Sequence, residues 1–270
     1  MLSQRLLLHL HGFKCAGSTF MWILEKNFPK KVLYVESLQG NTRLKYDRVE
    51  SLLENGNYSA ISSHLIAPPS KPESNVKPLV VAFLRDPVKR LISAYEFQKA
   101  TNSLKEGDVN FRAFLTRLRN SPVSNYQTRL ISPQSFNQTG ARNGWDINPR
   151  AIDLEDENIF IGTVEMFDQS MILLEEWLQD KGIKFDASYY LPNNTGSQQG
   201  VKKSTISTNM IFPDMVEIDQ FIWQEVTNRL KRITSSDDDF EDKMREFSRR
   251  RESLSGLEIS VAGPEDFVRL

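Results

Sequence analysis

The sequence predicts an α/β fold, a single domain with a central parallel sheet flanked by helices. Short apolar runs alternate along the chain with longer segments of helical periodicity, the order expected for parallel strands joined by helices. The chain has 270 residues, of which 39% are hydrophobic, and this is enough to bury one core. We expect residues 1–233 to form that core and residues 234–270 to form a polar C-terminal extension that is partly helical and solvated.

The chain opens with an apolar strand at residues 5–10 and a helix at 19–27. The turn between them, at residues 11–19, reads H-G-F-K-C-A-G-S-T. It has the G-x-x-x-x-G spacing of loops that bind nucleoside triphosphates, but Ser18 stands where those loops carry a lysine. The only lysine of the turn is Lys14, inside the loop.

A strand, a glycine turn and a helix in this order can cradle an anion. The backbone N–H groups at the start of the helix would converge on one point, where the positive end of the helix dipole also favours phosphate or sulfate. These groups belong to Ala16, Gly17, Ser18 and Thr19. The order makes the predicted sheet P-loop-like. A plain strand-to-helix turn is the alternative for this motif taken alone.

A second strand-to-helix junction leads into a predicted helix at residues 87–98. Asp86 can cap that helix, and Pro87 fits its first position, where a missing N–H costs nothing. Arg85 then stands at the carboxyl end of a strand and Ser93 two turns into the helix, both able to face the crevice where parallel sheets bind ligands. A guanidinium and a hydroxyl suit a terminal phosphate. The alternative for Arg85 is a salt bridge to Asp86 or a neighbouring carboxylate.

The remaining elements continue the alternation. A strand-like run at residues 58–63 ends at His64, and a later strand leads into Gly162. Further helices are expected at 111–119, 166–180 and 214–233. Apolar residues of the second of these helices repeat at helical spacing, which indicates a core face and not a cofactor site.

The two junctions together resemble the sulfotransferases that use 3′-phosphoadenosine 5′-phosphosulfate (PAPS). The resemblance rests on H-x-x-K-x-A-G-[ST]-[ST], which begins at His11, and on R-D-P-x-x-R-x-x-S-x-Y, which begins at Arg85. It is closest to the carbohydrate-type family that includes bacterial members and heparan 2-O-sulfotransferases. Cys15, Phe13 and Trp223 depart from the threonine, proline and tyrosine that are more usual there.

The resemblance implies a donor site built from both junctions. Lys14 and residues 16–19 would bind the 5′-phosphosulfate, and Arg85 with Ser93 would bind the 3′-phosphate. Lys203 resembles part of a late loop that closes over the 3′-phosphate. PAPS would be the co-substrate and 3′-phosphoadenosine 5′-phosphate (PAP) the product, with no metal.

Sulfuryl transfer accounts for a lysine in this place. Negative charge develops on the bridging oxygen of the leaving phosphate, and Lys14 with the loop amides would stabilise it. The acceptor must lose a proton, and histidine is the commonest general base near neutral pH. Of the three histidines, His9 lies within a strand, where a core role is expected, and His11 opens the loop, where it is expected to brace the turn. His64 emerges at a strand end and resembles the catalytic histidine of the family. His64 is the predicted base.

Charge limits the classes of partner. A net charge of −1 and a pI near 6.4 argue against a nucleic-acid-binding surface, so any attraction for an anionic acceptor would be local. Such a groove has four candidate arginines, which alternatively form only a solvated face: Arg112, Arg117, Arg119 and Arg129. The strand ends lead into glycine, histidine or arginine, so no acidic partner for magnesium is evident. The single Cys15 excludes an intramolecular disulfide.

Gln127 and Arg129 are candidate acceptor-binding residues, and an acceptor-binding region is expected after the helix that carries them. Residues 131–150 form a long, turn-rich segment, and Trp145 within it offers a flat face for a sugar. A surface loop with a tucked tryptophan is the alternative. The apolar stretch near the N-terminus is too short for a membrane span. Because Golgi members of the family that the chain resembles carry a membrane anchor, the resemblance then implies a cytoplasmic enzyme of bacterial type.

The predicted function is therefore direct, in-line transfer of a sulfuryl group from PAPS to an acceptor hydroxyl, with carbohydrate as the expected class. Two alternatives stay open. A P-loop kinase or nucleotidase predicts magnesium-dependent binding of ATP and no preference for a 3′-phosphate. A non-catalytic protein on the same fold predicts binding without turnover.

Overall fold

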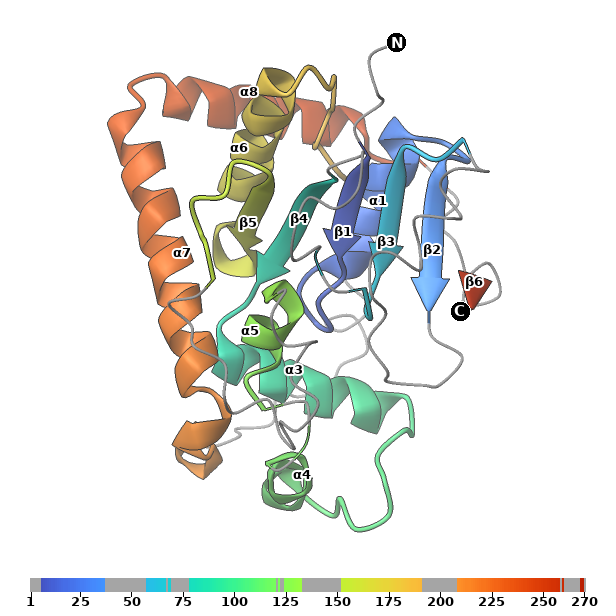
Figure 1. Ribbon diagram of the computed structural model, residues 1–270, viewed down its shortest axis with the longest axis vertical. Helices are drawn as coiled ribbons and strands as arrows, with labels where there is room; N and C mark the ends of the chain where they lie inside the picture. The colour runs from blue at the N-terminus through green and yellow to red at the C-terminus, as the bar shows by residue number, and fades with distance from the viewer. Residues whose placement is uncertain are drawn as a thin grey trace.

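A computed structural model describes most of the chain. The described residues are 6–36, 57–66, 68, 78–119, 121, 124–132, 152–190, 208–257, 259 and 268–269. They form an α/β fold whose central parallel sheet has six strands and is flanked by helices, so the predicted fold class is confirmed at this level (Figure 1). No helix in these ranges is long and apolar enough to cross a membrane.

The sheet has the strand order β5-β4-β1-β3-β2-β6, and all neighbouring strands are parallel. Its strands are β1 (Leu7–Leu10), β2 (Val32–Glu36), β3 (Ala60–Ser63), β4 (Leu79–Leu84), β5 (Ile159–Thr163) and β6 (Val268–Arg269). All residues of β1, β3 and β4 are buried, as expected for the central strands of a parallel sheet.

The strand order reverses its direction beside β1. From β1 the chain passes to β2 on one side of the sheet, and from β4 it passes to β5 on the other. Open parallel sheets bind ligands at such a reversal, outside the carboxyl ends of the strands. Leu10 is in register with Ser63 of β3 and Ala82 of β4, so these three strands run toward the same edge. The residues that follow them therefore meet there.

The helices have the following bounds: α1 (Gly17–Asn27), α3 (Pro87–Ala100), α4 (Phe111–Leu118), α5 (Tyr126–Ile131), α6 (Phe167–Asp180), α7 (Glu217–Ser236) and α8 (Phe240–Ser253). Short 3-10 turns are η3 (Val164–Met166), η4 (Thr208–Met210) and η5 (Pro213–Met215). The five helices whose bounds the sequence predicted are all present. In Figure 1, α1 lies behind β1 and β3, and α3 crosses below the carboxyl ends of the strands.

The start of α3 follows its local sequence. The side chain of Asp86 accepts a hydrogen bond of 3.0 Å from the backbone N–H of Lys89, and Pro87 occupies the first turn. Leu91 and Tyr95 are buried on the apolar face. The predicted cap and first turn are confirmed.

The C-terminal region differs from the expected solvated extension. Phe240 and Phe247 of α8 lie in the core, and Phe247 is fully buried. The two aromatic side chains are seven residues apart, so they share one face of the helix. Strand β6 also pairs with β2 at the edge of the sheet. Part of the region after residue 233 therefore contributes to the core.

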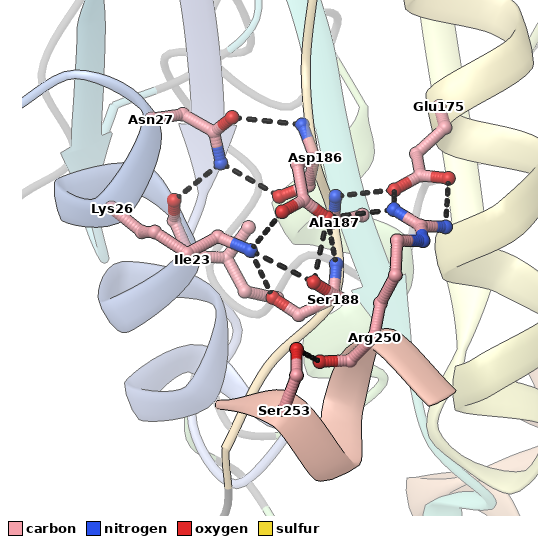
Figure 2. Close-up of polar contacts among 9 residues, drawn as sticks. All are labelled: Ile23, Lys26, Asn27, Glu175, Asp186, Ala187, Ser188, Arg250 and Ser253. Atoms are coloured by element: carbon pink, nitrogen blue, oxygen red, sulfur yellow. Dashed lines mark hydrogen bonds and ion pairs between the residues drawn. The ribbon is translucent and has the colours of Figure 1, made fainter. Parts of the chain in front are cut away.

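Polar contacts fasten α8 to the rest of the molecule, as Figure 2 shows. The guanidinium of Arg250 donates to both carboxylate oxygens of Glu175 on α6, at 2.7 and 2.8 Å. It also donates to Asp186 at 2.7 Å. Lys26 of α1 donates to the other oxygen of Asp186 at 2.8 Å and to the backbone and hydroxyl of Ser188. One network thus joins α1, α6 and α8.

Candidate functional site

In the turn between β1 and α1, the backbone φ angles of successive residues alternate between the left-handed region and negative values. Lys14 and Ala16 have φ angles of 65° and 60°, in the left-handed region, and Cys15 between them does not. Alternation of this kind points successive N–H groups to one side and forms a concavity suited to an anion. Helix α1 has no side-chain cap, and within the described residues no hydrogen bond engages the N–H groups of residues 16–19. These donors are free for a ligand.

Residue 17 must be glycine because the side chain of His11 lies directly against it. A Cβ atom at this position would lie 1.7 Å from Nε2 of His11, so the imidazole occupies the space that a side chain would need. The ring of His11 in turn lies 3.9 Å from the ring of His64, centroid to centroid. His11 therefore fills the gap between the start of α1 and the predicted base.

A hydrogen bond to the backbone fixes the tautomer of the His64 ring. Its Nδ1 lies 2.6 Å from the backbone carbonyl oxygen of His11. Because a carbonyl oxygen only accepts, Nδ1 carries the proton, and Nε2 of the neutral ring has a free lone pair. Burial lowers the pKa of His64, and the bond to His11 offsets this in part. The ring is therefore neutral at pH 7, the form that a general base requires.

The other two histidines are structural. His9 is 1% exposed, its Nδ1 lies 2.8 Å from the hydroxyl of Ser62, and burial lowers its pKa to about 3. This confirms the predicted core role. Burial and the neighbouring imidazoles hold the pKa of His11 well below its usual range. His11 braces the turn, as predicted.

Two cations meet at the turn without a carboxylate between them. Nη1 of Arg85 donates to the carbonyl oxygen of Lys14 at 3.2 Å, and Nζ of Lys14 lies 4.3 Å from the centroid of the Phe97 ring. Burial and the Arg85 guanidinium lower the pKa of Lys14. Neither residue forms an ion pair with any carboxylate in the part of the chain that the structure describes. The salt bridge considered for Arg85 is absent there.

Ser93 lies on the same side of α3 as these groups. It precedes Phe97 by four residues, so the two side chains share one face of the helix. That face also meets Phe13, whose ring packs edge-on against Phe97 at 5.8 Å. The structure therefore brings Lys14, Arg85 and the helix face of Ser93 to one edge of the sheet.

Gln127 is engaged inside the protein, which differs from the expectation that it contacts an acceptor. It is 1% exposed. Its Oε1 accepts from the backbone N–H of Arg85 at 2.7 Å, and its Nε2 donates to the carbonyl of Arg85 at 2.8 Å. The thiol of Cys15 lies 3.5 Å from the same Oε1. The side chain of Gln127 thus clamps the backbone of the second junction.

The remaining candidates divide into two groups. Trp145 and Lys203 lie outside the described residues. Among the candidate arginines, Arg117 pairs with Asp108, Arg119 pairs with Asp214, and Arg112 donates to the carbonyl of Met210. Arg129 lies on α5, and burial lowers its pKa.

Glu165 lies at the edge of the site, and no role was predicted for it from the sequence. Strand β5 extends through Thr163, so Gly162 lies inside the strand and the acidic residue follows its end. The Glu165 carboxylate accepts from the backbone N–H of Asp86 at 3.1 Å and from the indole N–H of Trp223 at 3.0 Å. The sequence signal that could have indicated this residue is a carboxylate two residues after the end of a strand.

Cys15 is not an activated nucleophile. Burial raises the pKa of its thiol to about 12, so the thiolate is absent at neutral pH.

The chain is similar to a protein of known sequence but matches no family model. A protein of Archaeoglobus fulgidus, described as uncharacterized, is 29% identical over 210 residues, which cover 71% of this chain and 80% of the relative. That description names no function for the relative.

Proposed function

We propose that this protein is a PAPS-dependent sulfotransferase that transfers a sulfuryl group to an acceptor hydroxyl, with carbohydrate as the expected acceptor class. One observation carries the proposal. The guanidinium of Arg85, from the second junction, donates to the carbonyl of Lys14 in the first, so both sequence motifs contribute to one site.

The charge of this site supports an anionic ligand. Lys14 and Arg85 repel each other, since no carboxylate pairs with either among the described residues. An anion placed between them would relieve that repulsion. The free N–H groups of residues 16–19 and the α1 dipole add to the attraction. PAPS carries phosphate groups at both ends of its ribose, which suits a site made of two junctions.

The chemistry assigned to the residues is a single displacement. The acceptor oxygen forms a bond to sulfur while the bond between sulfur and the bridging phosphate oxygen breaks. His64 takes the acceptor proton at Nε2, the nitrogen left free by the bond from Nδ1 to His11. Lys14 and the loop amides stabilise the charge that develops on the departing phosphate.

The test is a thermal shift assay without magnesium, comparing PAP with ADP at equal concentration. A ligand at about 100 times its dissociation constant adds roughly 2.7 kcal/mol to the free energy of unfolding. We expect a clear shift with PAP and a much smaller one with ADP. Equal shifts, or a shift with ADP only when magnesium is present, would favour the kinase alternative. No shift with PAP would reject the proposal.

Two variants separate the assigned roles. Arg85→Ala should reduce the PAP shift because it removes a cation of the donor site, whereas His64→Ala should keep the shift and abolish sulfation. Arg249→Ala is the matched control for charge removal, because that side chain is 75% exposed on α8. A His64→Ala protein that still sulfates an acceptor would remove His64 from the mechanism. An acceptor screen that finds no sulfated product would favour the non-catalytic alternative.

A further inference from the structure

The short helix α5 contacts both junctions of the proposed donor site through adjacent residues. The hydroxyl oxygen of Tyr126 accepts from the backbone N–H of Phe13 in the first junction, at 3.2 Å. The side-chain amide of Gln127 makes two hydrogen bonds to the backbone of Arg85 in the second junction, at 2.7 and 2.8 Å. Phe13 and Arg85 are far apart in sequence, so this helix is a direct physical link between the two loops.

Helix α5 is itself anchored at its N-terminus. The carboxylate of Asp219 on α7 is fully buried and accepts from the backbone N–H groups of Gln127 and Thr128, at 3.1 and 2.7 Å. In return, Oδ1 of Asn125 accepts from the backbone N–H groups of Ile218 and Asp219. Each helix thus supplies the cap of the other. This reciprocal arrangement fixes α5 relative to α7.

A buried arginine completes the unit. Arg90 is 1% exposed, and its guanidinium lies 4.9 Å from the centroid of the Tyr126 ring. Its charge favours the ionised form of Asp219, whose pKa burial raises. Arg90 lies on α3, one turn after the second junction, so α3, α5 and α7 meet around this residue. A link built on buried, mutually bonded groups is rigid.

We propose that Tyr126 and Gln127 are positioning residues that set the spacing of the two anion-binding loops and so select a ligand with two phosphate groups. The inference rests on the proposed function. A ligand that bridges both loops gains from their spacing, because its second phosphate binds at a high effective concentration only when the geometry matches. A ligand with one phosphate needs only one loop and is indifferent to the spacing.

The variants are Tyr126→Phe, which removes one oxygen, and Gln127→Met, which keeps the length of the side chain and removes both bonds to Arg85. Tyr189→Phe and Gln179→Met are the matched controls. Tyr189 is buried and its hydroxyl donates to Asp168 at 2.6 Å, away from both junctions, and Gln179 is exposed at the end of α6. Thermal unfolding without ligand checks that each variant folds. If Gln127→Met does not fold, Tyr126→Phe carries the test.

The experiment measures dissociation constants of PAP, 5′-AMP and 3′-AMP by titration calorimetry. Loss of the hydrogen bonds should weaken PAP binding about tenfold and change the binding of either monophosphate less than about twofold. The control variants should match the wild type for all three ligands. Equal losses for the three ligands, or no loss for PAP, would overturn the inference. A wild-type protein that binds PAP no better than the monophosphates would instead overturn the proposed function beneath it.

Discussion

Gly17 and His11 illustrate how one small residue holds the proposed site together. The imidazole of His11 lies where a side chain at residue 17 would be, and it separates the loop from His64. Glycine is needed here for space, since its φ is not in the left-handed region. The left-handed residues of the loop are Lys14 and Ala16, which tolerate that conformation at a cost of about 1 kcal/mol or more each.

Gly17→Ala should therefore disturb both the loop and the base. We expect a loss of about 1–3 kcal/mol in the free energy of unfolding, because the new methyl group overlaps the His11 ring. The PAP-induced thermal shift should also fall. Chemical denaturation of Gly17→Ala, His11→Ala and the double variant checks the cause. The alanine at residue 17 should cost much less when residue 11 is also alanine, and strictly additive costs would contradict the steric explanation.

Helix α8 shows how an element with a polar composition joins a core. Its many charged residues of both signs are typical of a solvated helix, but Phe240 and Phe247 form a buried stripe along one face. Arg250 then faces Glu175 and Asp186, while its neighbour Arg249 faces solvent and pairs with Glu246 one turn away. Adjacent arginines thus have different roles because a helix turns about 100° per residue.

Arg250→Ala should lower the free energy of unfolding by about 1–2 kcal/mol, because it removes charge-assisted bonds from a network that joins three helices. Arg249→Ala is the control, and it should cost less than about 0.5 kcal/mol. Urea denaturation of both variants at one pH and salt concentration measures the difference. Equal losses would show that the network in Figure 2 contributes no more than a surface pair.

Across the whole molecule, the buried histidines couple stability to pH. His9 titrates near pH 6.5 when unfolded, but burial lowers its pKa to about 3 in the folded protein. Between these values the unfolded chain binds more protons, so the free energy of unfolding falls as the pH falls. Burial lowers the pKa of His11 and His64 in the same direction. Glu36 and Asp219, whose pKa values burial raises, oppose the trend.

Substitution of His9 isolates its share of this pH dependence. Wild-type stability should decrease below pH 6.5, and His9 should account for about 1.4 kcal/mol per pH unit between pH 6 and pH 5. In His9→Gln the slope over this range should be smaller by that amount, whatever the absolute stability of the variant. Urea denaturation at pH 7, 6 and 5 gives both slopes. Parallel slopes would mean that His9 is protonated in the folded protein near its usual pKa.

Local features of this fold were readable from the amino-acid sequence. The predicted helices begin and end within three residues of their observed bounds, and Asp86 with Pro87 marks the start of α3 as expected. The strand β2 was not assigned, and β5 is longer than expected, so no role at a strand end was predicted for Glu165. Caps and periodicity act over a few residues, so their signals lie within a short stretch of sequence.

The sequence also placed Lys14, His64 and Arg85 at strand ends, because each follows an apolar run. Which strand ends are neighbours depends on the order β4-β1-β3, and this order follows from long-range packing. The same holds for the clamp of Gln127 on Arg85, which joins residues 42 positions apart. An amide side chain looks the same in sequence whether it faces a ligand or a backbone. Only the folded arrangement, which brings distant groups within hydrogen-bonding distance, distinguishes the two.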